Sequence, residues 1–232
     1  MFAGVAVPFD RATVTRTQNK VAYGQITAGK GKTRPANQGD IVAASSYLLT
    51  ESESRAELQY DDGSVVRIGQ NTVFSFEADS RTLSLKEGTF TFFVPRGQGG
   101  GMIKTPSLTA AITGTSGKVS RDTIAVLDGE LTLLPSGKKV KAGEFARRLP
   151  DGRIVVARFD PAKAIDGALM AFNGPMPGFS EERLLPGRRF QLAMPATSDF
   201  DALQRAQNLP ATLQRTRILV PRQRTENTPG PY

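Results

Sequence analysis

The residues Gly114 to Lys118 come closest to a known catalytic motif in this chain. A phosphate-binding loop needs Gly-x4-Gly-Lys-Ser/Thr, so that backbone amides hold the phosphate and the hydroxyl binds magnesium. Here Ile112 stands in place of the first glycine and Val119 in place of the hydroxyl. A serine elbow, Gly-x-Ser-x-Gly, also fails, because Lys118 occupies the second glycine position. We therefore interpret this stretch as a β-bend whose glycines permit positive φ and close packing.

The chain lacks two of the side chains that enzymes use most often for catalysis, Cys and His. The 232 residues include no Cys, no His and no Trp. Without Cys there is no thiol nucleophile, thiolate zinc site or disulfide, and without His the usual general base and metal ligand are missing. We predict that the chain is not an enzyme and carries no cofactor.

Acidic side chains at predicted turns leave one enzymatic alternative. Paired carboxylates can hydrolyse glycosidic bonds, so a carbohydrate-active enzyme stays open as a hypothesis. Acidic residues beside glycine are also typical of structural turns, which is the interpretation that we favour. The residues concerned are Asp61, Asp62, Glu87, Asp128, Glu130 and Glu144.

The formal charge of +8 lies on the two flanks of the chain. Residues 51–144 hold 11 basic and 12 acidic side chains, whereas residues 145–232 hold 13 and 8. Basic segments favour anionic surfaces, so a second hypothesis is a module that binds an anionic glycan or lipid surface, with nucleic acid a less favoured partner. The expected polyanion contacts are Arg215, Arg217, Arg222 and Arg224.

Five phenylalanines lie in apolar stretches between residues 74 and 93. Alternation with polar residues favours core packing, although a stacking platform for bases or sugars is the alternative. They are Phe74, Phe76, Phe90, Phe92 and Phe93.

Short β-prone runs fill the chain up to residue 158. Turn-forming residues recur every ~8–12 residues, which is the spacing of sandwiches, barrels and β-solenoids. We predict a mainly β module of many short strands, either a sandwich or solenoid-like. Hairpin turns are expected at Asp61–Ser64, Asp128-Gly129, Ser136-Gly137 and Asp151-Gly152.

The pattern changes after Asp160. Asp160 and Pro161 suit a helix start, and Ala162, Ile165, Leu169 and Met170 follow at helical spacing. We predict four parts: an N-terminal strand and loop segment (1–38), a β domain (39–158), a small helical extension (159–208) and a basic, disordered tail (209–232).

The β region resembles the FecR domain family. Ten short pieces match in order, among them Asp61–Gly69, Leu85–Gly88, Ala111–Thr115, Val126–Glu130 and Ala142–Glu144. Within them we assign a structural motif to Asp62, Gly63, Ser64, Gly69, Gly88, Gly114, Thr115, Gly129 and Gly143.

The resemblance implies an extracytoplasmic, all-β domain that acts through protein contacts. The best-known members are inner-membrane regulators of sigma factors, with a cytoplasmic anti-sigma segment, a membrane helix and a periplasmic domain. This chain lacks an apolar run of ~18–20 residues, and residues 1–38 do not resemble an anti-sigma helix bundle. It is more similar to the stand-alone, exported members.

We therefore expect a non-enzymatic protein-interaction, signalling or structural module of the bacterial envelope, in the periplasm or secreted. Residues 1–9 are apolar but lack a basic start. They are interpreted either as the remainder of a truncated export signal or as a short strand at a frayed terminus.

Overall fold

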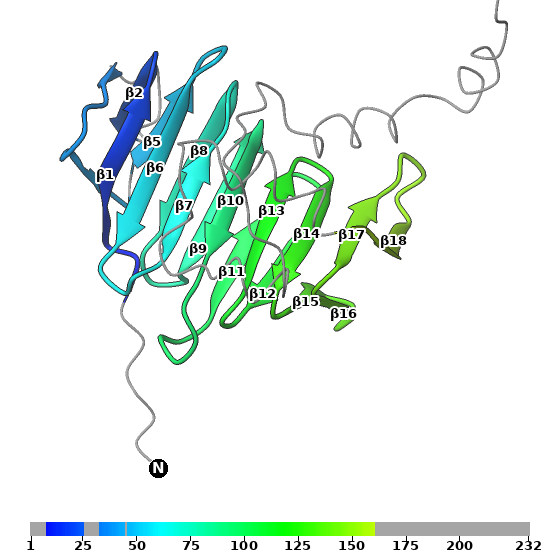
Figure 1. Cartoon of the computed structure of the whole chain (residues 1–232). Helices are drawn as coiled ribbons and strands as arrows, with labels where there is room; N and C mark the ends of the chain where they lie inside the picture. Colours follow the sequence, from blue (N-terminus) through cyan, green and yellow to red (C-terminus); the bar gives the residue numbers. More distant parts are fainter. Residues whose placement is uncertain (1–7, 26–32, 45, 161–232) are drawn as a thin grey trace, which may run out of the picture.

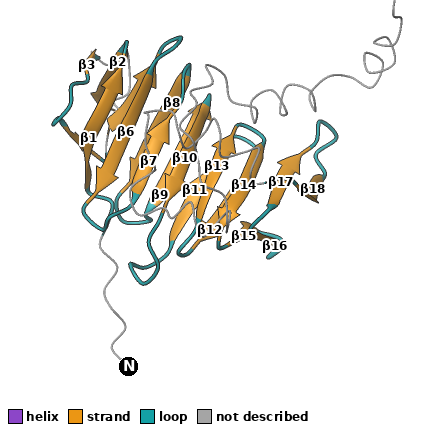
Figure 2. Ribbon diagram, in the orientation of Figure 1, coloured by secondary structure: helices purple, strands orange, loops and turns teal. Residues whose placement is uncertain are grey.

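A computed structural model describes residues 8–25, 33–44 and 46–160. Within these ranges the chain forms strands, turns and loops, arranged as two nine-stranded sheets (Figures 1 and 2). Sheet A contains, in spatial order, β18 (Ile154–Arg158), β17 (Glu144–Arg148), β14 (Thr123–Asp128), β13 (Ser116–Ser120), β10 (Thr89–Phe93), β7 (Val65–Ile68), β6 (Arg55–Tyr60), β1 (Arg11–Gln18) and β4 (Ile41–Ala43).

Sheet B has the same number of strands and lies behind sheet A in Figure 1. Its strands, in spatial order, are β16 (Lys139–Lys141), β15 (Glu130–Leu134), β12 (Thr109–Ile112), β11 (Gly101–Lys104), β9 (Thr82–Glu87), β8 (Thr72–Glu77), β5 (Ser46–Thr50), β2 (Val21–Gln25) and β3 (Arg34–Pro35).

The order of strands in both sheets follows the order of the sequence, apart from β3 and β4 at the N-terminal end. The chain adds a single strand or a hairpin to one sheet and then crosses to the other, so that the colours in Figure 1 run along the molecule from blue to yellow-green. Only β9 and β11 pair in parallel among the described strands. The fold is thus a sandwich that is built progressively, in the manner of a solenoid.

One apolar core lies between the two sheets. Phe74 and Phe76 of sheet B and Phe90 and Phe92 of sheet A are almost fully buried in it. The ring centroids of Phe74 and Phe90, one from each sheet, are 5.2 Å apart. Such edge-on aromatic contacts add to the free energy gained from burying apolar surface. Phe93, in contrast, points to the other side of sheet A and is half-buried.

The mainly β prediction is confirmed, and three of the four expected hairpins form. The pairs β6–β7, β15–β16 and β17–β18 are antiparallel neighbours joined by the predicted turns. The prediction for Asp128-Gly129 was wrong. Strand β14 belongs to sheet A and β15 to sheet B, so these residues pass the chain between the sheets instead of folding it back.

The sequence division at residue 38 separates strands that the structure joins. Strand β1 pairs with β6, and β2 pairs with β5, so both N-terminal strands are part of the same two sheets. The predicted helical extension and basic tail lie outside the described residues, as do residues 1–7. In the described part of the chain, no helix has the length and apolar character needed to cross a membrane.

Candidate functional site

The predicted motif residues Asp62, Gly63 and Ser64 form the turn between β6 and β7. The carboxylate of Asp62 accepts hydrogen bonds from the backbone N–H of Ser64 at 2.8 Å and from its hydroxyl at 2.9 Å. Asp favours such turns because its side chain can accept from the backbone two residues further on. The motif therefore fixes a hairpin.

Asp62 also forms a buried ion pair with Arg81, which lies just before β9. The Arg81 Nη2 to Asp62 Oδ2 distance is 2.6 Å, and the side chains are 6% and 0% exposed. Arg81 donates a second bond to the Gly100 carbonyl, and its guanidinium lies 4.1 Å from the ring centroid of Phe9. One motif carboxylate thus joins a hairpin of sheet A, a turn of sheet B and the N-terminal residues.

Five of the predicted motif glycines lie where the chain crosses between sheets. They are Gly69, Gly88, Gly114, Gly129 and Gly143. Neighbouring crossovers bind one another: the Gly69 N–H donates to the Thr89 carbonyl at 2.9 Å, and the Ala142 N–H donates to the Gly129 carbonyl at 3.0 Å. The strand registers place Gly69 and Gly88 at one end of the strands and Gly114, Gly129 and Gly143 at the opposite end, so the two sheets are linked at both ends.

Threonine hydroxyls add a hydrogen bond at each of these two ends. Thr115 donates to the Glu130 carbonyl at 2.7 Å, and Thr50 donates to the Gly69 carbonyl at 2.6 Å. The residues from Ser116 onward are strand β13, so Gly114–Lys118 does not form a phosphate-binding loop.

Three of the predicted turn carboxylates each form an ion pair with a basic side chain. Asp61 pairs with Arg11, Glu130 pairs with Lys139, and Asp62 pairs with Arg81. The turn that carries Asp61 and Asp62 precedes β7, and Asp128 ends β14, which is three strand positions away in sheet A. That spacing is about 14 Å, whereas glycosidase carboxylates are ~5–10 Å apart.

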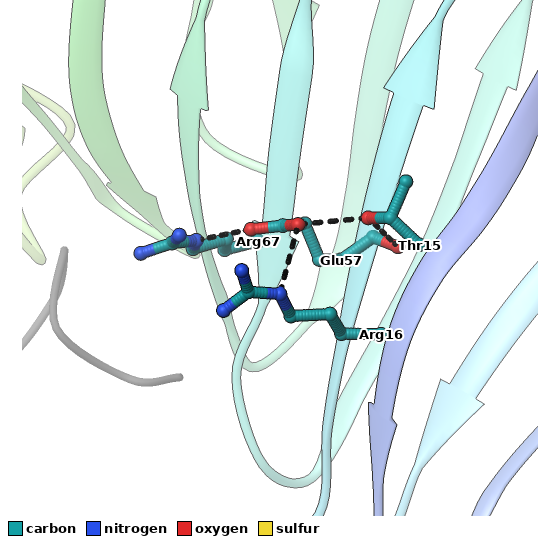
Figure 3. A network of polar contacts seen from close by, with 4 residues as sticks. All are labelled: Thr15, Arg16, Glu57 and Arg67. Atoms are coloured by element: carbon teal, nitrogen blue, oxygen red, sulfur yellow. Dashed lines mark hydrogen bonds and ion pairs between the residues drawn. The ribbon is translucent and has the colours of Figure 1, made fainter. Parts of the chain in front are cut away.

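A second buried ion pair was not singled out from the sequence. Glu57 of β6 accepts from the Arg67 Nε at 2.6 Å and from the Thr15 hydroxyl at 2.8 Å, and the Arg16 Nε lies 3.7 Å away (Figure 3). The side chains of Glu57 and Arg67 are 3% and 2% exposed. Burial lowers the pKa of Arg67, and the hydrogen bond and charge of Glu57 oppose that shift. Opposite charges at facing positions of two adjacent strands were the available indication.

The outward face of sheet B is the open surface of the sandwich. Along β5 and β8 buried core residues alternate with half-buried outward ones. We define the open face of sheet B by its half-buried, uncharged outward residues. They are Tyr47, Leu49, Val73, Ser75, Ser84, Met102, Thr109, Ala111 and Thr132. Exposed charged groups such as Lys86, Glu87 and Lys104 lie beside them. Aromatic residues and Met are enriched in protein interfaces and Lys and Glu are depleted at their centres, so this composition suits contact with a protein.

The expected polyanion contacts Arg215, Arg217, Arg222 and Arg224 lie outside the described residues. No group of three or more acidic side chains in the described ranges is arranged to hold a metal ion.

The fold and its internally bonded polar residues define a two-sheet β module. Residues 46–132 of this module match the FecR family, described as FecR protein. The resemblance stated from the sequence is therefore confirmed for those residues, which extend from β5 into β15. No curated protein matches the chain.

Two crystal structures, at 1.65 and 2.50 Å resolution, are similar to the chain. Both are of a "putative anti-sigma factor" from Parabacteroides distasonis ATCC 8503, with 21% sequence identity and a TM-score of 0.45. The similarity covers 52% of this chain and 63% or 62% of the other chains, so this chain spans less than two thirds of their length.

Proposed function

We propose that this protein is a non-enzymatic, extracytoplasmic FecR-like module of the bacterial envelope that acts in signalling through protein contacts. The observation that carries the proposal is the FecR match over residues 46–132. These residues supply the central strands of both sheets, and their two buried ion pairs, Asp62–Arg81 and Glu57–Arg67, are formed within the module. A rigid scaffold of this kind presents a surface rather than a reaction centre.

The open face of sheet B is the surface that we assign to the partner. It combines Tyr47, Leu49, Val73 and Met102 with small, uncharged side chains. A partner with an apolar, weakly charged surface would bury these side chains and gain free energy roughly in proportion to the apolar area removed from water.

The compartment is tested by fractionating cells that make the protein and by treating intact spheroplasts with a protease. An extracytoplasmic protein is degraded while cytosolic markers survive. Protein found only in the cytosolic fraction would overturn this part of the proposal.

The contact surface is tested with a photo-crosslinking residue at Val73 or at Ala111 on the open face. The matched control carries the same residue at Asp151, in the exposed β17–β18 turn. We expect the same partner to be captured from both face positions and not from the turn. We also expect Val73→Lys to abolish capture from Ala111 while the β-type circular dichroism spectrum is kept. Equal capture at face and turn would show that the assigned surface is wrong.

A further inference from the structure

Four of the described strands lie at the edges of the two sheets, and three of them are protected from pairing with another chain. The edge strands are β3 and β16 in sheet B and β4 and β18 in sheet A. Proteins protect sheet edges by keeping the edge strand short or by placing Lys or Pro on it. Strand β3 has two residues and includes Pro35, β4 has three residues, and β16 has three residues, of which two are exposed lysines.

Strand β18, at the C-terminal end of sheet A in Figure 1, differs from the other three edges in length and composition. It has five residues and begins with three successive β-branched apolar residues, Ile154 to Val156, which are half-buried. Its one charged residue, Arg158, is at its end and faces Glu144 of β17. A longer, apolar edge strand is a place where a further strand can add to the sheet.

Hydrogen bonds at both ends of the β17–β18 hairpin show how its backbone groups alternate. Residues that face each other in an antiparallel pair alternate between hydrogen-bonded and non-hydrogen-bonded pairs. The Leu149 N–H donates to the Arg153 carbonyl at 2.8 Å, and the Phe159 N–H donates to the Gly143 carbonyl at 2.9 Å. These residues face each other when the register of the hairpin is continued at either end, so the odd-numbered residues of β18 bond to β17.

The even-numbered residues of β18 therefore direct their backbone N–H and C=O groups away from β17. The Arg148 N–H agrees with this assignment: Arg148 faces Ile154, but its N–H donates to the Asp122 carbonyl on the other side of β17 at 2.9 Å. The backbone groups that point to the open edge of sheet A are those of Ile154, Val156 and Arg158.

The side chains of β18 continue the apolar core to this edge. Ile154 and Val156 pack against the core cluster but are only half-buried. Val156 faces Ala146 of β17, which is fully buried. The core thus ends at a strand whose core-facing side chains are still partly exposed to water, and covering them would gain free energy.

A second copy of β18 fits both the backbone groups and the side chains. In an antiparallel pair with a two-fold axis at Val156, Val156 bonds to its counterpart and Ile154 bonds to Arg158 of the second copy, so every open-edge residue is bonded. Facing residues point to the same side of a sheet, so the core-facing side chains of both copies lie together. The aliphatic part of Arg158 then covers Ile154 of the second copy.

The charges near β18 are already balanced within one molecule. Arg153 forms an ion pair with Asp151 in its own turn at 2.7 Å, and Arg158 faces Glu144. In the symmetric register neither arginine faces an arginine of the second copy. An edge that is apolar at its centre and balanced in charge favours a partner strand of the same composition over a strongly charged one.

We propose that β18 pairs antiparallel with β18 of a second copy, so that sheet A continues from one molecule into the other across a two-fold axis at Val156. One strand from each molecule buries much less than the ~1,600 Å² of a standard interface. The dimer is therefore weak, and β18 is an open edge in dilute solution. This inference does not rest on the proposed function, because β18 lies outside residues 46–132 and outside the open face of sheet B.

The absence of Cys from the sequence permits a direct test on the full chain. Hydrogen-bonded residues of an antiparallel pair have Cα atoms about 5.5 Å apart, which a disulfide can span. We expect Val156→Cys to form a covalent dimer under mild oxidation, at a rate that rises with protein concentration. The matched control is Ile41→Cys on β4, the opposite edge of sheet A, where Ile41 is 53% exposed. Crosslinking of Ile41→Cys as fast as that of Val156→Cys would overturn the proposal.

Sedimentation velocity measures the non-covalent pair in the parent chain. We expect the average mass to rise between about 5 and 500 µM protein, as for a weak interface. Val156→Pro should weaken association at least about tenfold, because it removes an N–H that points to the open edge and is not bonded to β17. Ile41→Lys should leave association unchanged.

Val155→Lys is the second variant in case Val156→Pro loses the β-type circular dichroism spectrum. It places two like charges close to the two-fold axis and should also weaken association. Because each copy carries a formal charge of +8, added salt should strengthen the association of the parent chain by screening the repulsion between copies. A parent chain that stays monomeric at every concentration would show that the edge is covered within the chain, and the proposal would be wrong. Association that both β18 variants leave unchanged would also overturn it.

Discussion

Two adjacent aspartates in the β6–β7 turn have opposite environments at the residue scale. Asp62 is fully buried against Arg81, whereas Asp61 and its partner Arg11 are 55% and 63% exposed. Removing one partner of a buried ion pair leaves an uncompensated charge, whereas an exposed pair is screened by water. The consequences of the same substitution should therefore differ sharply.

We predict that Asp62→Asn lowers the free energy of unfolding by about 3–5 kcal/mol, and that Asp61→Asn lowers it by less than about 1 kcal/mol. Urea unfolding followed by circular dichroism measures both. Equal effects of the two substitutions would show that the Arg81 pair does not stabilise the folded state.

Tyr60 carries a buried hydroxyl without a hydrogen-bond partner among the described residues. Burial, and secondarily the charge of Asp62, raise its pKa well above the usual tyrosine value of about 10. The folded protein thus holds the phenol proton more tightly than the unfolded chain. This contribution to stability is fully present below the unfolded pKa of about 10 and is lost as the pH rises toward the folded value.

Tyr60→Phe should therefore leave stability at neutral pH unchanged or slightly higher and should reduce the loss of stability above about pH 10. Thermal unfolding from about pH 7 to pH 11 tests this, with Tyr47→Phe as the control because Tyr47 is half-buried. A steeper alkaline loss in Tyr60→Phe than in the parent would contradict the assigned direction.

At the scale of the strands and turns, the crossover glycines differ from glycines in open loops in what surrounds them. Gly88 and Gly97 both have φ of +81°, but their surroundings differ. A Cβ at Gly88 would contact the Thr72 side chain and lie 2.6 Å from the Asn71 carbonyl oxygen, whereas a Cβ at Gly97 would have no neighbour within 4 Å. Comparing an alanine substitution at each position therefore distinguishes the cost of backbone strain from the cost of crowding at a crossover.

We predict that Gly97→Ala costs only the backbone term of ~1–2 kcal/mol. Gly88→Ala should cost clearly more, because the adjoining Asn71-Thr72 crossover must move. Thermal or urea unfolding of the two variants gives the comparison. A Gly88→Ala variant as stable as Gly97→Ala would mean that the crossovers do not pack as described.

Two Asp-Gly turns show which features of a turn the local sequence predicts and which it does not. The Asp-Gly pairs at Asp62-Gly63 and Asp128-Gly129 look alike in the sequence, and both glycines have positive φ, at 81° and 86°. The first makes a hairpin and the second crosses between sheets. Local propensity sets the bend, but the sheet that the next strand joins depends on contacts distant in sequence.

The candidate surfaces were harder to predict than the strands. The alternation in β5 and β8 identifies their core sides, whereas β14 is apolar at four successive positions, Ile124 to Leu127. A short apolar run does not tell which of its faces is covered, because that depends on segments elsewhere in the chain. The buried Glu57–Arg67 pair depends instead on the register of the β6–β7 hairpin, which brings the two side chains together.

The whole molecule has a centre and two ends, because its strand order follows the sequence. At the C-terminal end lie β18, with half-buried and exposed residues, and β16, with exposed Lys139 and Lys141. At the N-terminal end lie β3, which is exposed, and β4, whose Ile41 is 53% exposed. The core cluster is continuous from Phe9 to Ala146 and draws its largest side chains from the central strands.

A sandwich built in this way should open from its ends. Each strand binds mainly its neighbours, as in repeat proteins, so the outermost strands are lost at lower free energy than those held on both sides. We predict that amide hydrogen exchange is fastest in β3, β4, β16 and β18 and at least about 100-fold slower in β10, β13 and β8. Native-state exchange with peptide-level mass spectrometry measures this profile at constant pH.

The exchange-protected amides of β13 should outlast those of β12, which lies nearly as centrally in sheet B but has an open outer face. Uniform protection from one end to the other would instead show a single cooperative unit, and the fold would then unfold as a conventional sandwich rather than strand by strand from its edges.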